Sequence, residues 1–489
     1  MRIRLAALVM MGLTIIVSAS PLRADPMADQ IRKVRDALVP STVVVSYYVD
    51  RDDGSRSDAR IIGTVVGPGN LVMFSSAAIP SQIALTQFHD FKAIVTKGDD
   101  LLTFDAEYLG KDDQAQVAFV KVTDPKAPAL PVIAFEEQAK PQTGDPVVSL
   151  TMLGEPDGYE RIIQVSRVAG RIDQPVVTYL CAGGLGMLGT PVMTLEGKVI
   201  GIVGIVRLNR ATNARPNWSS VEVIWPTERF LERLKNPPKG GGLVKRPWMG
   251  IETLTPVTKD LAEYFKLGDR RGVIIGHVIE KGPAEQAGLK AEDIVLAVNG
   301  KDIRGTEGQL VENFTNDIRE RKIGEVLTLG VWRAGKIETL KLTLAEQPKS
   351  AAEAERFRIA SFGLTVREMV LGDRLTRELP TAETGVVVGF VDGGGWAHDG
   401  GLRADDIIKK VQDKDTPTLA EFKKVFSEEV RKKPKEIVLF VLRGTKETQL
   451  VRIEPRWDAA KPPEKPPEKK PEAEGQPKPA PAEKPPGPK

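Results

Sequence analysis

The chain has 489 residues, with 69 Lys and Arg against 66 Asp and Glu, so its formal net charge is +3. This near balance gives no reason to expect a nucleic acid or a strongly acidic surface as partner, and no nucleic acid is predicted. The length leaves room for about three domains, each with its own core. The one cysteine, Cys181, has no second thiol for an intramolecular disulfide.

The amino-terminal segment predicts export. Arg2 and Arg4 precede an apolar run from Leu5 to Val17, and small residues follow. A charged start, a short apolar stretch and a small-residue exit are typical of a secretory signal peptide, here over residues 1–24. The run falls short of the ~20 residues that cross a membrane. We therefore expect a periplasmic or secreted protein; an uncleaved segment that anchors the chain to the membrane stays open as the alternative.

The first block, from Pro26 to about Lys235, contains short runs rich in β-branched residues. Turn residues separate the runs at the spacing of an antiparallel barrel protein. The clearest runs are residues 42–45, 61–66, 117–122 and 199–203. This pattern predicts a mainly β domain built from barrels.

Two linkers and a tail divide the rest of the chain. Residues 237–245 mix prolines with glycines, and residues 347–357 begin with Gln347-Pro348-Lys349-Ser350. Residues 457–489 repeat Lys, Pro and Glu and lack the apolar side chains that offset the entropy cost of ordering. This composition predicts a disordered tail, and whether it serves as a tether stays open.

The second and third blocks repeat each other at a constant offset of 113 positions. The segment around Gly272 aligns with that around Gly385, and Gly250 aligns with Gly363. The residue pattern of each repeat predicts a strand, a short helix, a strand that begins at an Asp-Ile pair, a second helix (308–319 or 419–430) and a final strand. The pattern Gly-Pro-Ala-Glu-Gln-Ala-Gly-Leu-Lys-Ala-Glu-Asp-Ile closely resembles PDZ domains in their bacterial arrangement.

The resemblance to PDZ domains implies peptide binding. In that fold a peptide adds as a strand to an open sheet edge, and an apolar-Gly-apolar loop holds its terminal carboxylate. A glycine in the loop allows the close backbone approach. The alternative is that these residues merely start a strand. The matching positions are Trp248, Met249, Gly250, Ile251, Ser361, Phe362, Gly363 and Leu364.

The first block resembles the HtrA/DegP-type serine proteases. Gly186-Met187-Leu188-Gly189-Thr190-Pro191-Val192 is similar to the family's Gly-Asn-Ser-Gly-Gly-Pro-Leu, which puts Leu188 at the nucleophilic serine. The segment at 70–79 puts Ala77 at the histidine, and the segment at 115–122 puts Gln116 at the aspartate. The resemblance thus implies a trypsin-like double barrel in which all three catalytic positions are changed.

Loss of the three side chains predicts loss of catalysis. The serine attacks, the histidine takes its proton and the aspartate orients the imidazole. The block has a single histidine, His89, with Ser75 and Ser76 nearby in the sequence, so an improvised triad is the alternative. Proximity in sequence does not supply the fixed geometry that a triad needs. The sequence predicts no cofactor and no metal site, because it has no Cys/His cluster, P-loop or EF-hand pattern.

Taken together, the sequence predicts a mainly β, multidomain protein: a trypsin-like double β-barrel, two PDZ (α+β) domains and a disordered Pro/Lys/Glu-rich tail. The predicted parts are 1–24 (signal peptide), 25–236 (trypsin-like domain), 237–245 (linker), 246–346 (first PDZ domain), 347–357 (linker), 358–456 (second PDZ domain) and 457–489 (tail).

The expected function is non-catalytic. The predicted pseudoprotease binds peptide or unfolded-protein carboxyl termini through its PDZ domains, as scaffold, adaptor or chaperone in envelope protein quality control. The alternative is an active serine endopeptidase of the HtrA/DegP type with an atypical catalytic site. The resemblance implies a homotrimer, and a hetero-oligomer with an active homologue is the second arrangement considered.

Overall fold

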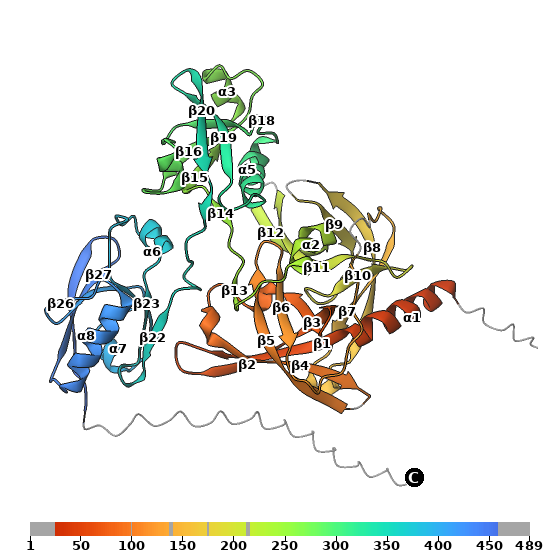
Figure 1. Ribbon diagram of the computed structural model, residues 1–489, viewed down its shortest axis with the longest axis horizontal. Helices are drawn as coiled ribbons and strands as arrows, with labels where there is room; N and C mark the ends of the chain where they lie inside the picture. The colour runs from red at the N-terminus through yellow and green to blue at the C-terminus, as the bar shows by residue number, and fades with distance from the viewer. Residues whose placement is uncertain (1–24, 99, 136–139, 174–175, 212–215, 458–489) are drawn as a thin grey trace, which may run out of the picture. The chain divides into compact units, whose positions relative to one another are not determined.

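The computed structural model describes residues 25–98, 100–135, 140–173, 176–211 and 216–457 (Figure 1). The predicted signal peptide and all of the predicted tail but Trp457 lie outside the described residues. The chain divides into two compact units, the first reaching Glu353 and the second starting at Ala354, with residues 52–55 assigned to the second. No helix within the described ranges is both long enough and apolar enough to span a membrane.

A closed barrel of six strands follows helix α1 (Pro26–Leu38). The strands pair in the order β5-β4-β1-β2-β3-β6, and β5 also pairs with β6, which closes the barrel. Apolar side chains of Val43, Val45 and Phe74 fill its core, because alternate residues of a strand point to the same face. The strands are β1 (Thr42–Asp50), β2 (Arg56–Gly67), β3 (Leu71–Ser75), β4 (Phe88–Lys97), β5 (Asp100–Asp112) and β6 (Val117–Val122).

A second closed barrel has the order β10-β11-β12-β9-β8-β7 and is followed by helix α2 (Leu231–Lys235). Val147, Val192 and Ile224 belong to its core. These two six-stranded barrels confirm the predicted trypsin-like double barrel. The strands are β7 (Pro146–Met152), β8 (Arg161–Ile172), β9 (Thr178–Ala182), β10 (Pro191–Thr194), β11 (Val199–Ala211) and β12 (Pro216–Pro226).

The segment after α2 lies along the first barrel. Strand β13 (Gly242–Leu243) pairs in parallel with β5. The carboxylate of Asp112, which is 1% exposed, accepts hydrogen bonds from Arg233 Nε at 2.9 Å and from Arg246. It also accepts the Ala115 backbone N–H at 3.0 Å. Part of the predicted linker 237–245 is therefore fixed by strand pairing, and the residues on either side of it, Arg233 and Arg246, bind the buried Asp112.

The first repeat is a sheet of order β15-β16-β17-β19-β20 that packs against α5. Leu310, Phe314 and Ile318 lie four residues apart and form the buried face of α5. The elements are β14 (Pro247–Trp248), β15 (Ile251–Pro256), α3 (Lys259–Tyr264), β16 (Val273–Val278), α4 (Pro283–Gln286), β17 (Ile294–Val298), β18 (Lys301–Asp302), α5 (Leu310–Arg319), β19 (Val326–Arg333), β20 (Lys336–Thr343) and β21 (Ala345–Glu346).

The second repeat has the order β22-β23-β24-β25-β27-β28, with α8 packed on its core. Its sheet has the same succession of strands but carries the additional strand β22 at one edge. The elements are β22 (Arg356–Ile359), β23 (Leu364–Glu368), α6 (Leu371–Thr376), β24 (Val386–Val391), α7 (Trp396–Asp399), β25 (Ile407–Val411), β26 (Lys414–Asp415), α8 (Leu419–Arg431), β27 (Ile437–Arg443) and β28 (Glu447–Ile453).

Each repeat contains the same buried ion pair. Asp293, 2% exposed, accepts from Arg333 Nε at 2.7 Å and Nη2 at 2.6 Å. Asp406 accepts from Arg443 Nε at 2.8 Å and Nη2 at 2.6 Å. Two parallel bonds from one guanidinium fix both position and orientation. The pair ties the start of the central strand to the end of a neighbouring strand in both repeats.

We expect Asp293→Ala to lower the free energy of unfolding of the first repeat by about 2 kcal/mol, because it removes both charge-assisted hydrogen bonds of the bidentate pair. Arg333 keeps its contacts with Glu338 and with the Gly288 carbonyl. Hydrogen exchange of the β19 amides in the whole chain measures this locally, since a multidomain chain has no single unfolding transition. Asp302→Ala, at an exposed carboxylate of the same repeat, is the control. A loss below about 1 kcal/mol for Asp293→Ala would contradict the prediction.

Candidate functional site

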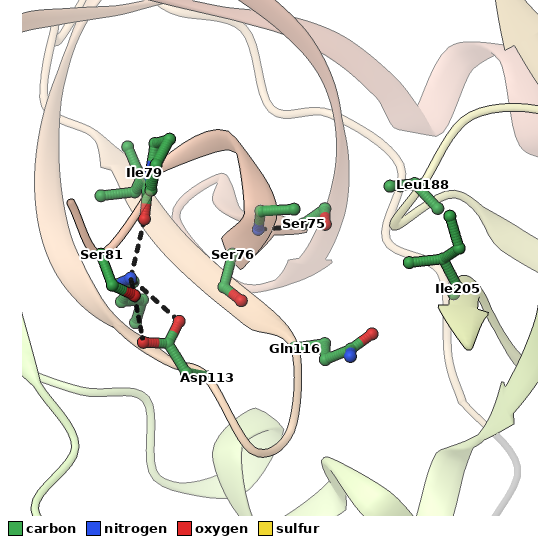
Figure 2. A pocket seen from close by; sticks show the side chains of 12 residues that line it. Ser75, Ser76, Ile79, Ser81, Asp113, Gln116, Leu188 and Ile205 are labelled. Carbon is green, nitrogen blue, oxygen red and sulfur yellow. Dashed lines mark hydrogen bonds and ion pairs between the residues drawn. The ribbon is translucent and has the colours of Figure 1, made fainter. Parts of the chain in front are cut away.

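A cavity of about 140 Å³ lies where the three positions predicted to correspond to the catalytic triad meet (Figure 2). Ala77, Gln116 and Leu188, which are far apart in the sequence, all line it. In Figure 2 Leu188 and Ile205 lie on one side, Ser81 and Asp113 on the other, and Gln116 between them. The full lining is Ser75, Ser76, Ala77, Ile79, Pro80, Ser81, Lys111, Asp113, Gln116, Leu188, Gly204 and Ile205.

Ala77 sits in a one-turn 3-10 helix, Ser76–Ala78, directly after β3. The Ser75 hydroxyl caps this turn by accepting the Ala77 N–H at 3.3 Å. The Ser76 N–H donates to the Gln116 carbonyl oxygen at 3.2 Å, which holds the two loops together. The geometry places an exposed methyl group at the rim of the cavity, with no nitrogen to accept a proton.

Gln116 is the most tightly bound of the three. Its backbone has φ of +59°, and its Oε1 accepts the Trp225 indole N–H at 2.6 Å. The Arg229 guanidinium stacks on Trp225, 3.8 Å from the ring centroid, and Nη2 donates to the Gln114 carbonyl at 2.8 Å. Burial lowers the pKa of Arg229 to about 10. The neutral Gln116 amide therefore accepts a hydrogen bond from Trp225, on which Arg229 stacks. It has no carboxylate to orient a base.

Leu188 is half-buried and packs against the core of the second barrel. The next residue, Gly189, has φ of +84°, and a Cβ atom there would lie 2.6 Å from the Ser75 backbone nitrogen. Only glycine permits this approach. Its N–H donates to the Val203 carbonyl oxygen at 2.8 Å. The loop is fixed against both barrels, and the side chain it presents at position 188 has no hydroxyl.

The cavity also contains serines and a lysine, which raises the question of a substitute nucleophile and base. Lys111 is 1% exposed, and its Nζ lies 2.7 Å from the Ile79 carbonyl oxygen, 2.9 Å from Asp113 Oδ1 and 3.5 Å from Ser81 Oγ. In Figure 2 dashed lines end at the labelled Ile79 and Asp113. Lys111 Nζ thus lies among three oxygen atoms, of which the Ser81 hydroxyl is the most distant.

His89 lies elsewhere. It belongs to β4, with Nε2 2.9 Å from Asp50 Oδ2 and Nδ1 3.0 Å from Asp90 Oδ2. It is absent from the cavity lining, which contains no histidine. The improvised triad of His89 with Ser75 or Ser76 therefore lacks the required juxtaposition.

In the first repeat, the residues with PDZ-type spacing surround the start of β15. Met249 is buried, and its carbonyl accepts the Ala284 N–H at 2.7 Å. Gly250 has φ of +80°, and a Cβ atom there would lie 2.9 Å from Pro283 Cδ. Trp248 pairs with β21, and Ile251 begins β15. Among the described strands β15 pairs with β16 only, so it forms an end of the sheet.

In the second repeat, the matching residues start a strand whose outer edge is covered. Phe362 is fully buried among Trp396, Phe426 and Trp457, with ring centroids 5.1, 5.0 and 6.1 Å away. Gly363 has φ of +63°. Ser361 lies in the short helix before it, and Leu364 begins β23, which pairs with β22 as well as β24.

Strand β22 is not among the predicted elements, and its first two residues, Arg356 and Phe357, fall in the predicted linker 347–357. Alternation of Arg356, Phe357, Arg358 and Ile359 is a strand signal, but four residues after a Pro/Ala/Glu-rich stretch carry little weight alone. No cluster of three or more His, Cys, Asp or Glu side chains able to hold a metal occurs in the described ranges. Burial raises the pKa of the Cys181 thiol to about 11, so it is a poor nucleophile.

Comparison with known proteins agrees with the fold. Residues 62–202 match the trypsin-like peptidase domain family, and residues 247–344 match the PDZ domain family. A probable periplasmic serine endoprotease, DegP-like, of Brucella suis biovar 1 is 28% identical over 375 residues, covering 73% of this chain and 67% of its own. A relative with the same description from Bartonella henselae is 25% identical over 383 residues, covering 75% and 71%.

A solved structure of a variant of the HtrA-type protease AlgW with a decapeptide is similar in fold. Its TM-score is 0.51 at 17% identity, and the match covers 66% of this chain and 98% of that one. The double barrel, the PDZ domain that follows it and the DegP-like relatives together show that this chain belongs to the HtrA/DegP-like family.

Proposed function

We propose that this chain is an exported, non-catalytic member of the HtrA/DegP-like family that captures peptide or unfolded-protein carboxyl termini through its first PDZ repeat. It would act as scaffold, adaptor or chaperone in envelope protein quality control. The observation that carries the proposal is the cavity lined by Ala77, Gln116 and Leu188, which holds no histidine.

The chemistry of acyl transfer supports the absence of catalysis. A serine needs a base in hydrogen-bond contact, and that base needs a group to orient it. Leu188 offers no nucleophile, Ala77 offers no base, and the Gln116 amide oxygen is committed to Trp225. Removing the serine or the histidine of a triad alone costs on the order of a million-fold in turnover. With all three positions changed, the trypsin-like domain has no group to carry out peptide hydrolysis by this mechanism.

The end strand β15 supports peptide capture. A strand at the end of a sheet presents unpaired N–H and C=O groups, to which an extended peptide adds. Gly250 lets the backbone before β15 turn beside Pro283, where a larger residue would collide. The HtrA-type neighbour of similar fold was solved with a decapeptide. A carboxyl-terminal peptide with apolar side chains is the ligand class we assign to this edge.

The site of action follows from the relatives and the amino terminus. The DegP-like relatives are described as periplasmic, and residues 1–24 have a signal-peptide pattern. We therefore place the protein outside the cytoplasm. Trimer formation, or assembly with an active homologue, remains a prediction for light scattering to decide.

The second candidate is an active serine endopeptidase. It is favoured by the description of the relatives as serine endoproteases and by Ser75, Ser76 and Ser81 in the cavity. It requires a base that reaches one of these hydroxyls. His89 is engaged by Asp50 and Asp90 outside the cavity, and Lys111 Nζ lies closer to the Ile79 carbonyl and to Asp113 than to Ser81.

The first prediction from this proposal concerns hydrolysis. The purified chain is expected to form no adduct with a fluorophosphonate probe and to digest casein at least about a million-fold more slowly than an active protease of the same fold. The matched variant Ala77→His/Gln116→Asp/Leu188→Ser is expected to label at position 188, because the three positions line one cavity. Labelling of the unmodified chain at any serine, abolished by His89→Ala, would refute the non-catalytic assignment.

The second prediction concerns peptide capture. Peptides from a free-carboxylate library are expected to bind the whole chain, and amidation of the carboxyl terminus weakens them at least about tenfold, or about 1.4 kcal/mol. Gly250→Val should cause a similar loss, because its Cβ would meet Pro283. Asp302→Ala, at an exposed carboxylate of the same repeat, is the control. Fluorescence polarisation measures both, and equal binding of amidated peptides would contradict carboxylate capture.

A further inference from the structure

Strand β22 occupies the edge of the second repeat to which a peptide would add. It runs antiparallel to β23, with Phe357 opposite Val366 and Ile359 opposite Leu364. The ladder extends one residue further, since the Glu368 N–H donates to the Glu355 carbonyl at 2.9 Å. An antiparallel strand added to a sheet edge is the arrangement in which PDZ domains hold their ligands.

The apolar side chains of β22 pack against the second repeat, as the side chains of a bound peptide would. Phe357 and Ile359 are half-buried and pack against the core of the second repeat. Lys423 of α8 lies with its Nζ 5.4 Å from the Phe357 ring centroid and forms an ion pair with Glu355. The strand is therefore contacted by β23 through its backbone and by α8 through its side chains.

A polar contact fixes the other face of β22. Arg358 Nη2 lies 3.1 Å from Asp392 Oδ2, and the Asp392 N–H donates to the Gly363 carbonyl at 2.7 Å. The Arg358–Asp392 contact thus joins the inserted strand to the segment that supports the glycine loop. The Gly363 N–H itself donates to the Ala360 carbonyl at 3.1 Å, so this donor of the loop is engaged by the chain directly after β22.

The corresponding segment of the first repeat takes another path. At the offset of 113 positions, residues 356–359 align with residues 243–246. That segment pairs with the first barrel, where the Val244 N–H donates to the Lys111 carbonyl at 2.9 Å and Arg246 binds Asp112. It leaves β15 at the end of its sheet. Two repeats with the same core thus differ in whether their peptide edge is covered.

We propose that residues 355–359 are an internal ligand that closes the peptide edge of the second PDZ repeat. The inference goes beyond capture by the first repeat and stands whether or not that repeat binds. A covalently attached strand competes at an effective concentration on the order of millimolar. External peptides therefore reach this edge only when β22 is released, and the released site takes extended segments with apolar side chains at alternate positions and a basic residue between them.

Binding by the full chain tests the proposal. The probe is a fluorescein-labelled hexapeptide of sequence Ala-Glu-Arg-Phe-Arg-Ile with a free carboxylate, a copy of residues 354–359. Phe357→Glu/Ile359→Glu removes both apolar anchors of β22. This variant is expected to bind one more probe molecule per chain than the unmodified protein. Leu450→Glu, at an exposed leucine of β28 in the same repeat, is the control and should add none.

Hydrogen exchange supplies a measurement that needs no variant. In the unmodified chain the Glu368 amide is expected to exchange slowly, like amides inside the sheet, because it donates to Glu355. The β15 amides that face away from β16 should exchange faster. Fast exchange at Glu368 would overturn the proposal even if the double variant failed to fold. In a folded double variant, Glu368 should lose protection while the β27 amides keep theirs.

The binding counts separate this proposal from peptide capture by the first repeat. If the unmodified chain binds one probe molecule and the double variant binds two, both proposals are supported. If the unmodified chain binds none and the double variant binds one, only the internal ligand is supported. An unmodified chain that already binds two probes overturns the internal ligand. So does a folded variant, with β27 still protected, that gains no site.

Discussion

The buried carboxylate of Asp112 joins three parts of the chain that are far apart in the sequence. It accepts hydrogen bonds from Ala115 in the loop before Gln116, from Arg233 after the second barrel and from Arg246 at the entry to the first repeat. A carboxylate that is 1% exposed requires such partners, because burial of an unpaired charge is costly. The loop of Gln116 and the path of residues 237–246 both depend on this one side chain.

The cavity between the barrels is held by contacts that do not involve catalytic chemistry. Gln116 is fixed by Ser76 and Trp225, and Gly189 brings the loop of Leu188 against Ser75. These contacts are backbone and packing interactions, which need neither a nucleophile nor a base. The proposed non-catalytic role is compatible with this frame, because such contacts do not depend on the side chains at positions 77 and 188.

The two repeats share the ion pair that stabilises their fold but differ in the strand pairing at the sheet edge. Both contain the bidentate pair, Asp293 with Arg333 and Asp406 with Arg443. The segment before each glycine loop differs: in the first repeat it lies on the barrel, and in the second it folds back as β22. The edge of a sheet exposes unpaired N–H and C=O groups unless another segment pairs with it. In the second repeat β22 pairs with this edge, whereas in the first repeat β15 forms the end of the sheet.

The sequence by itself determined the family, the double barrel and the repeat, because strand alternation, turn residues and motif spacing are local signals. It also predicted that Ala77, Gln116 and Leu188 would lie together, and all three line one cavity. Only the tertiary structure decided that Gln116 bonds Trp225 and that residues 356–359 cover β23. Both are contacts between segments that are separate in the sequence and have only a weak local pattern, and which segment pairs with a sheet edge cannot be read from the periodicity of either one. Whether the peptide edge of a repeat is paired is therefore decided by the tertiary structure and not by the glycine motif.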